Sequence, residues 1–183
     1  MTVEATRRSP LSGWRLNAPE LEVQAAEVPF LTSVNLRVGP GPAQPFEPGL
    51  SLPTTPNAVV SRDDLAVLWL GPDEFLVVGH DGAGPELMTR LRVRTGGRWA
   101  SAVDVSADRA CVELRGAGVR EVLEKGCPLD LHRRAFPPGR CAQTVLAKAQ
   151  VILWRPAEQV YRLLVRRSYA HYLAAWLSDS ANP

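Results

Sequence analysis

The feature that most constrains the fold is a series of short apolar segments in the C-terminal part of the chain, at residues 101–178. Apolar residues alternate at Ala110, Val112 and Leu114, a pattern that predicts a strand ending at a glycine turn. The same reasoning predicts three more strands, at 141–147, 150–154 and 160–165. This part of the chain is therefore expected to contribute most of a sheet.

Two segments of this region have helical periodicity. Residues 117–126 place Val119, Val122 and Leu123 on one face, with Gly126 as the expected C-terminal cap. Residues 168–179 form a second amphipathic segment, with Ser168 as the expected N-cap. The predicted face of this last helix consists of Tyr169, Tyr172, Leu173, Trp176 and Leu177.

The preceding region repeats the same order of elements. Two strands are predicted at 64–70 and 75–80, joined by a turn, and a short helix follows around 84–94. The order strand, strand and helix occurs again at 101–126 and indicates a weak internal repeat. This order predicts an α+β domain with antiparallel or mixed sheets and helices packed on one side.

Residues 1–60 differ from the rest because proline and glycine are dense there. Proline removes backbone donors, so these stretches resist regular ladders. Residues 20–38 alternate well enough for one or two strands, interrupted at Pro29. We expect 1–60 to be an extended arm, with a disordered tail as the alternative, and 61–183 to be one α+β domain of two pseudo-repeated halves.

Composition excludes several classes of protein. The net charge of +2 is too small to indicate a nucleic-acid partner, and no apolar stretch approaches the roughly 20 residues that span a bilayer. The first residues lack the apolar run of a secretory signal, so the expected compartment is the cytoplasm. Only Lys125 and Lys148 are lysines among the 21 basic residues, which reflects either codon usage or arginine-rich protein contacts.

The cysteines and histidines are scattered. Cys111, Cys127 and Cys141 form no CxxC pair, and their number is odd. This spacing argues against a zinc site and against a disulfide framework. We expect buried, reduced thiols and no metal site.

Several motifs resemble those of sarcosine oxidase gamma subunits. They are LPTTPN (52–57), WLGPDEFLVV (69–78), KGCPLDLH (125–132), FPPGRCAQT (136–144), LAKAQVILWR (146–155) and RSYAHYLAAWL (167–177). The resemblance covers about residues 50–178, and FPPGRCAQT after KGCPLDL is its most specific part.

The resemblance implies a fold similar to the folate-binding domain of aminomethyltransferase, the T-protein of glycine cleavage. It implies alpha, beta and delta partner subunits in a complex that oxidises the methyl group of sarcosine at a flavin, forms hydrogen peroxide and passes the one-carbon unit to tetrahydrofolate. Flavin, NAD and the folate site would belong to the alpha and beta subunits and zinc to delta. No cofactor is implied on this chain.

The residues that could carry chemistry have plainer explanations. Gly116 and Gly118 follow a strand as in a nucleotide-binding loop, but the third glycine is missing, and a turn plus a helix start explains both. Cys127 has His132 nearby in sequence, yet a thiol at the C-terminal end of a helix is poorly activated. We expect Cys127 to pack beneath its loop and His132 to lie at the surface.

No general base is evident either. Segment 149–154 corresponds to the place where the related transferases carry an assisting carboxylate, and it contains no acidic residue. Asp104 and Asp130 are isolated, and Asp104 is expected to end a strand or cap a turn. The letters Lys125-Gly126-Cys127 also match a motif of stand-alone folate-dependent proteins that support iron–sulfur enzymes, although the residues that follow differ.

These observations favour a non-catalytic gamma subunit that docks on the alpha subunit. A stand-alone folate-binding protein is the alternative, and the substrate of the complex could be sarcosine or a related N-methyl amino acid. Large side chains in loops or in the arm are the expected contacts with the partner. They are Trp14, Arg98, Trp99, Arg133 and Arg134.

Overall fold

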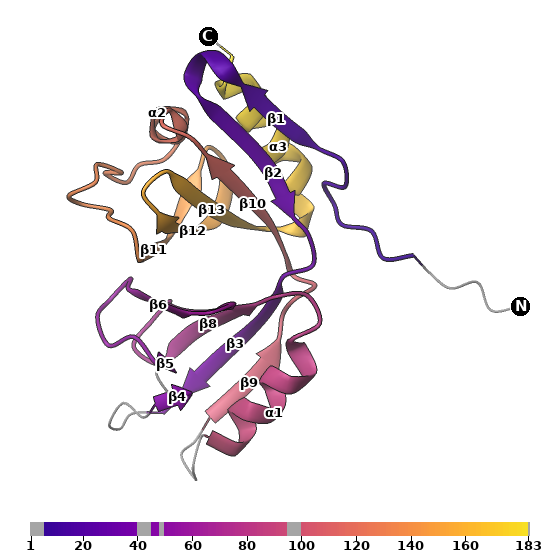
Figure 1. Ribbon diagram of the computed structural model, residues 1–183, viewed down its shortest axis with the longest axis vertical. Helices are drawn as coiled ribbons and strands as arrows, with labels where there is room; N and C mark the ends of the chain where they lie inside the picture. The colour runs from indigo at the N-terminus through magenta and orange to yellow at the C-terminus, as the bar shows by residue number, and fades with distance from the viewer. Residues whose placement is uncertain (1–5, 40–44, 48–49, 95–99, 183) are drawn as a thin grey trace, which may run out of the picture.

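The computed structural model describes residues 6–39, 45–47, 50–94 and 100–182, and contains two large antiparallel sheets (Figure 1). The six-stranded sheet contains, in spatial order, β1 (Arg15–Ala18), β2 (Val23–Val28), β10 (Arg109–Arg115), β13 (Val160–Arg166), β12 (Ala149–Ala157) and β11 (Arg140–Leu146). The five-stranded sheet contains β6 (Val59–Arg62), β7 (Leu65–Trp69), β8 (Glu74–Gly79), β3 (Thr32–Val38) and β9 (Ala100–Asp104). A separate small ribbon pairs β4 (Pro45–Glu47) with β5 (Leu50–Ser51).

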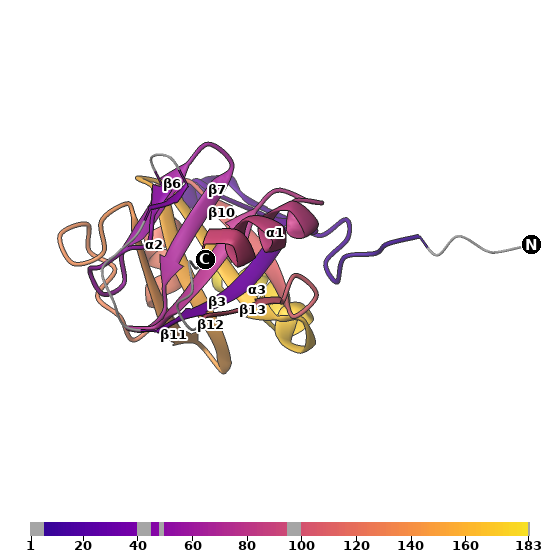
Figure 2. The same ribbon diagram turned by 90° about the horizontal axis from the view of Figure 1, so that it is seen from below.

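Helices lie on the outer faces of both sheets. The helical segments are α1 (Gly84–Arg94), α2 (Val119–Glu124), α3 (Ala170–Ser180) and the 3-10 turns η1 (Pro19–Leu21) and η2 (Arg167–Tyr169). α1 covers the five-stranded sheet (Figure 2), while α2 and α3 pack on the six-stranded sheet. This arrangement confirms the α+β class. It corrects the expectation that all helices lie on one side.

The layer between the two sheets explains the continuous apolar runs of the sequence. Val67 faces the core under α1, whereas the next residue, Leu68, faces the other sheet. On β12, Leu153 packs in the core under α2 and α3, whereas Trp154 packs between the sheets. Successive side chains of a strand point to opposite faces, so a strand covered on both faces needs apolar residues throughout.

The two sheets are connected by segments that pass from one to the other. β2 continues after a short link into β3, and β9 continues into β10, while β2 pairs with β10 and β3 pairs with β9. Two of the strands from the predicted arm thus lie inside the sheets, with the predicted break at Pro29. The predicted boundary between an arm and a domain at residue 60 differs from the structure. Residues 15–38 form strands of the two large sheets, because they pair with strands far away in the sequence.

One local expectation needs a different reason, and two others need correction. Gly126 follows the C-cap residue Lys125, as predicted, but it does not adopt a positive φ; it is small because a Cβ there would lie 2.6 Å from the indole of Trp176. Ser168 lies within η2, and the N-cap residue of α3 is Tyr169, without a side-chain capping bond. The predicted face of the last helix is confirmed for Leu173 and Leu177, which are buried, and for Trp176, which packs partly buried on the core. It is wrong for Tyr169 and Tyr172, which are exposed, while Ala170 and Ala174 are buried.

Candidate functional site

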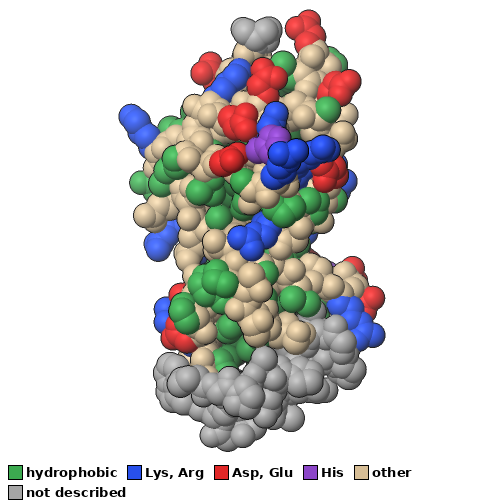
Figure 3. Space-filling model, turned by 90° about the vertical axis from the view of Figure 1, so that its left-hand side faces the viewer, with side chains coloured by type: hydrophobic (Ala, Val, Ile, Leu, Met, Phe, Trp, Pro, Cys, Tyr) green, Lys and Arg blue, Asp and Glu red, His purple; other side chains and the backbone are tan. Residues whose placement is uncertain are grey.

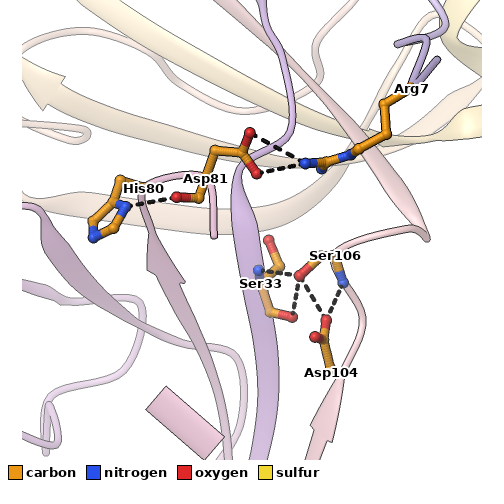
Figure 4. A network of polar contacts seen from close by, with 6 residues as sticks. All are labelled: Arg7, Ser33, His80, Asp81, Asp104 and Ser106. Atoms are coloured by element: carbon orange, nitrogen blue, oxygen red, sulfur yellow. Dashed lines mark hydrogen bonds and ion pairs between the residues drawn. The ribbon is translucent and has the colours of Figure 1, made fainter. Parts of the chain in front are cut away.

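The connection between the two sheets is held by a small polar network (Figure 4). The Ser33 amide donates to Ser106 Oγ at 3.0 Å, and Ser106 donates to Asp104 Oδ1 from its amide at 2.9 Å and from its hydroxyl at 2.6 Å. Asp104 is the last residue of β9, so its carboxylate fixes the turn into β10. This confirms the predicted structural role of Asp104.

The N-terminal segment is attached to the same region. Arg7 Nη1 lies 3.0 and 3.2 Å from the two carboxylate oxygens of Asp81 (Figure 4). The Arg7 guanidinium also lies 4.2 Å from the ring centre of Phe30. Farther along, the buried carboxylate of Glu27 accepts hydrogen bonds from Ser9 Oγ at 2.5 Å and from the Leu11 amide at 3.1 Å. Residues 7–11 are therefore held against the strands that join the sheets.

Two of the three thiols are enclosed between the sheets. Cys111 on β10 and Cys141 on β11 are both buried in that layer, and burial raises the pKa of each to about 12. The Cys141 thiol contacts the backbone carbonyl oxygen of Trp69 at 3.4 Å. Such thiols remain protonated at neutral pH and are poor nucleophiles.

The third thiol and the nearest histidine have separate surroundings. Cys127 is partly buried and packs against the core of the six-stranded sheet. His132 is exposed; its amide donates to Asp130 Oδ1 at 2.8 Å, and the Arg134 amide lies 3.3 Å from its Nδ1. These placements confirm the expectation that Cys127 packs beneath the loop and that His132 lies at the surface.

The two glycines of the RGAG segment serve close backbone packing. Gly116 has a φ of +125°, and a Cβ there would lie 1.7 Å from the carbonyl oxygen of Glu22. A Cβ on Gly118 would lie 2.0 Å from the carbonyl oxygen of Leu21. The turn before α2 therefore packs on η1 and on the residue that follows it, and the predicted turn and helix start account for both glycines.

Lys125, Gly126 and Cys127 likewise have structural roles. Lys125 Nζ donates to the carbonyl oxygen of Ser180 at 2.7 Å, which ties the end of α2 to the end of α3. Gly126 accommodates Trp176, and Cys127 faces the core. Nothing in these contacts favours the stand-alone folate-binding protein.

An open basic pocket lies beside α2. It has a volume of about 440 Å³ and is bounded by the turn before α2, the loop that contains His132 and the β12–β13 turn. Its charged side chains are Arg120, Arg133, Arg155 and Glu158. Figure 3 shows a histidine beside basic side chains on this half of the molecule, with acidic side chains among them. The geometry can accommodate an anionic group.

Arg155 forms the buried wall of this pocket. Its side chain is only 5% exposed; Nη1 donates to the Phe136 carbonyl at 2.7 Å and Nη2 to the Glu158 carbonyl at 2.6 Å. The guanidinium lies 5.1 Å from the ring centre of Tyr161. Burial raises the pKa of Tyr161, while the charges of Arg155 and Arg120 oppose that rise.

The predicted interface residues are not brought together into one cluster. Trp14 precedes β1 and packs partly buried on the core of the six-stranded sheet, whereas Arg133 and Arg134 are exposed on the loop before β11. Arg98 and Trp99 lie outside the described residues. Sequence reasoning missed Arg155, because an arginine at the end of an apolar run gives no sign of the loop that it binds.

Two features are absent from the residues that the structure describes. Within the described ranges, no group of three or more histidine, cysteine, aspartate or glutamate residues is arranged to hold a metal ion. Over the same residues, no helix has the length and hydropathy needed to cross a bilayer.

Comparison with known sequences identifies a family. Residues 43–182 match the model of the sarcosine oxidase, gamma subunit family. The chain is 40% identical over 163 residues to the sarcosine oxidase subunit gamma of Corynebacterium sp. (strain P-1), covering 86% of this chain and 79% of the relative. It is 39% identical over 159 residues to the Arthrobacter sp. subunit gamma, covering 84% and 77%.

Comparison with solved structures agrees. A chain of the heterotetrameric sarcosine oxidase from Corynebacterium sp. U-96 superposes with a TM-score of 0.83 at 35% identity, covering 96% of this chain and 94% of that one. The glycine cleavage system aminomethyltransferase T from Bartonella henselae has a TM-score of 0.61 at 14% identity, covering 87% and 46%, which shows a shared fold. This chain belongs to the sarcosine oxidase gamma subunit family.

Proposed function

We propose that this chain is a non-catalytic subunit of a heterotetrameric sarcosine oxidase, in which it docks on the alpha subunit and stabilises the assembled enzyme. The observation that carries this proposal is the likeness, over nearly the whole length of both chains, to a component of a heterotetrameric sarcosine oxidase. A subunit that keeps this complete fold offers the same surfaces for assembly.

The use of the reactive side chains supports a non-catalytic role. The Cys111 and Cys141 thiols are buried with raised pKa values, and the Asp104 carboxylate is engaged by Ser106. Gly116 and Gly118 pack closely against the backbone carbonyl oxygens of Glu22 and Leu21, which accounts for both glycines without a nucleotide-binding loop. These two thiols, this carboxylate and these two glycines are thus committed to the fold.

The chemistry of the complex is assigned to its other subunits. On this proposal, alpha and beta carry flavin, NAD and the tetrahydrofolate site, delta carries zinc, and this chain carries no cofactor. The complex removes the methyl group of sarcosine or a related N-methyl amino acid oxidatively, forms hydrogen peroxide and transfers the one-carbon unit to tetrahydrofolate. Its place is the cytoplasm.

The partner contacts are proposed to include Trp14, Arg133 and Arg134. Both arginines are exposed, and Arg is favoured at interfaces because its planar head makes several hydrogen bonds. Reversing both charges, with Arg133→Glu and Arg134→Glu, should reduce recovery of the alpha subunit with the tagged chain. Arg62→Glu, an exposed change on β6 of the other sheet, is the matched control.

Co-expression tests the proposal as a whole. The alpha, beta and delta subunits are produced with and without this chain, and flavin absorbance, melting temperature and sarcosine-dependent peroxide formation are measured. We expect the isolated chain to be colourless and inactive, and the complex without it to melt at a lower temperature or to be recovered in lower yield. Flavin bound to the isolated chain would contradict the proposal.

A further inference from the structure

The basic pocket beside α2 is built from three separate parts of the chain. The turn before α2 and its first residues supply Gly116 and Arg120, the loop before β11 supplies His132 and Arg133, and the β12–β13 region supplies Arg155. Such a convergence of polar groups around a hollow is typical of a ligand site. The volume of about 440 Å³ lies in the range that small ligands occupy.

The positive charge in this pocket is only partly compensated. Arg155 is nearly buried, and its one carboxylate neighbour, Glu158 Oε1 at 3.3 Å, belongs to a side chain that is 63% exposed. Its Nε is buried and has no hydrogen-bond partner within the described residues. Nη1 and Nη2 already donate to carbonyl oxygens and Nε is enclosed, so Arg155 acts on an anion in the pocket through its positive charge.

The mouth of the pocket adds further cationic groups. Arg120 makes only a long contact with Glu124, at 3.8 Å, and Arg133 has no ion pair in the part of the chain that the structure describes. Three arginines therefore line the pocket opposite a single glutamate, with the His132 ring beside them. Guanidinium groups bind the two oxygens of a carboxylate or phosphate with parallel hydrogen bonds.

Part of the wall is fixed by the fold. Arg155 donates to the Phe136 and Glu158 carbonyls, so its charge stays in place rather than swinging into solvent. Tyr161, 2% exposed, lines the same pocket under the guanidinium. A fixed cationic base with mobile arginines at the rim can receive an anion without reorganising the core.

We infer that this pocket is a binding site for a small oxyanion ligand, a molecule that presents a carboxylate or phosphate group to Arg120, Arg133 and Arg155. The occupant is a free small molecule that enters from solvent. The site is formed by this chain alone, and because Arg133 is also a proposed partner contact, binding is tested on the isolated full chain.

Inorganic phosphate and citrate are the probes, titrated into the full chain at constant pH and constant ionic strength. NMR of the histidine rings reports the site, because His132 lines the pocket whereas His80 and His171 do not. We expect a saturable shift of the His132 signal by at least one probe, with a Kd of about 1 mM or below. Calorimetry gives an independent value of the Kd.

Variants of exposed arginines at the rim test ligand binding without disturbing the fold. Arg120→Gln with Arg133→Gln removes two exposed charges and should weaken binding by at least about tenfold, because each charge-assisted hydrogen bond is lost. Arg134→Gln is the matched control: it is the exposed neighbour of Arg133 but does not line the pocket, and should leave the Kd unchanged. Equal weakening by both would indicate unspecific charge screening and overturn the site.

Two further results would overturn the inference. One is no saturable shift of His132 with either probe. The other is a shift of the His80 and His171 signals equal to that of His132, because neither of those rings lines the pocket and the probe would then act unspecifically.

Discussion

Trp154 and Arg155 are neighbours on β12, yet they lie in opposite environments. Trp154 is 4% exposed and packs in the apolar layer between the two sheets. Arg155 is as deeply buried on the other face, where it fixes the loop before β11 and forms the wall of a cationic pocket. The two faces of β12 therefore have different roles. The face between the two sheets contributes to the apolar core, and at Arg155 the opposite face supplies a charged side chain to the pocket.

Gly116 should show the largest effect, because it forms the edge of the pocket and also packs against Glu22. Gly116→Ala combines a positive φ with a Cβ 1.7 Å from a carbonyl oxygen, and should lower the free energy of unfolding by about 4 kcal/mol. Gly82→Ala is the control: φ is +81° but nothing lies within 4 Å, so about 1 kcal/mol is expected. Urea denaturation measures both, and equal losses would argue against the close contact.

The layer between the sheets should be the next most sensitive. Leu164→Ala removes a side chain that is 2% exposed there, and should lower the free energy of unfolding by about 3 kcal/mol. Val145→Ala on β11, where the side chain is 40% exposed, should cost less than about 0.5 kcal/mol. Thermal denaturation distinguishes the two, and similar melting temperatures would mean that the sheets are not held by this layer.

Arg155→Met tests the buried guanidinium on the other face of β12. The change keeps an apolar stem but leaves the Phe136 and Glu158 carbonyls without their donor, so a loss of about 2 kcal/mol is expected. Faster proteolysis of the loop before β11 should accompany it. Arg120→Met, on an exposed side chain, should cost less than about 0.5 kcal/mol. A variant more stable than the parent would show that Arg155 is not needed to hold the loop.

The smallest effect concerns pH. Burial raises the folded-state pKa of Cys111 and Cys141 to about 12, above the usual value of 9.0, so their contribution to stability is complete below pH 9 and is lost as pH rises toward 12. Because the thiols ionise more easily in the unfolded state, each should lower the free energy of unfolding by about 1 kcal/mol at pH 10 relative to pH 7. Urea denaturation at pH 7, 9 and 10 measures the loss. In the Cys111→Ala, Cys141→Ala double variant this decrease should be smaller; an unchanged pH dependence would contradict the assignment.

Much of the fold could be predicted from periodicity. The helix expected around 84–94 is α1, and the strands expected in 141–165 are β11, β12 and β13 within a few residues. Local pattern could not reveal that 23–28 and 32–38 pair with β10 and β9, about 60 to 90 residues away, because such pairing is set by the tertiary fold. The predicted face of α3 was right for Leu173, Trp176 and Leu177. It was wrong for Tyr169 and Tyr172, because a tyrosine has an apolar ring and yet can lie at the solvent edge.

The site was harder to predict than the fold. The RGAG glycines could be explained as a turn because the nucleotide-binding spacing was incomplete, and the structure supplies their close contacts. The pocket could not be foreseen, because Arg120, Arg133 and Arg155 lie far apart in sequence and meet only through the packing of α2, the loop and the β12–β13 turn. Arginines in a sequence rich in arginine carry little information on their own.

Native mass spectrometry of the co-expressed subunits tests the central claim most directly. The tagged chain of 20.0 kDa is produced with its partner subunits and purified by its tag. The account predicts one copy of this chain in a four-subunit complex that contains flavin and forms peroxide from sarcosine. Recovery of the chain alone, while the other subunits assemble into a fully active and equally stable oxidase without it, would contradict the account.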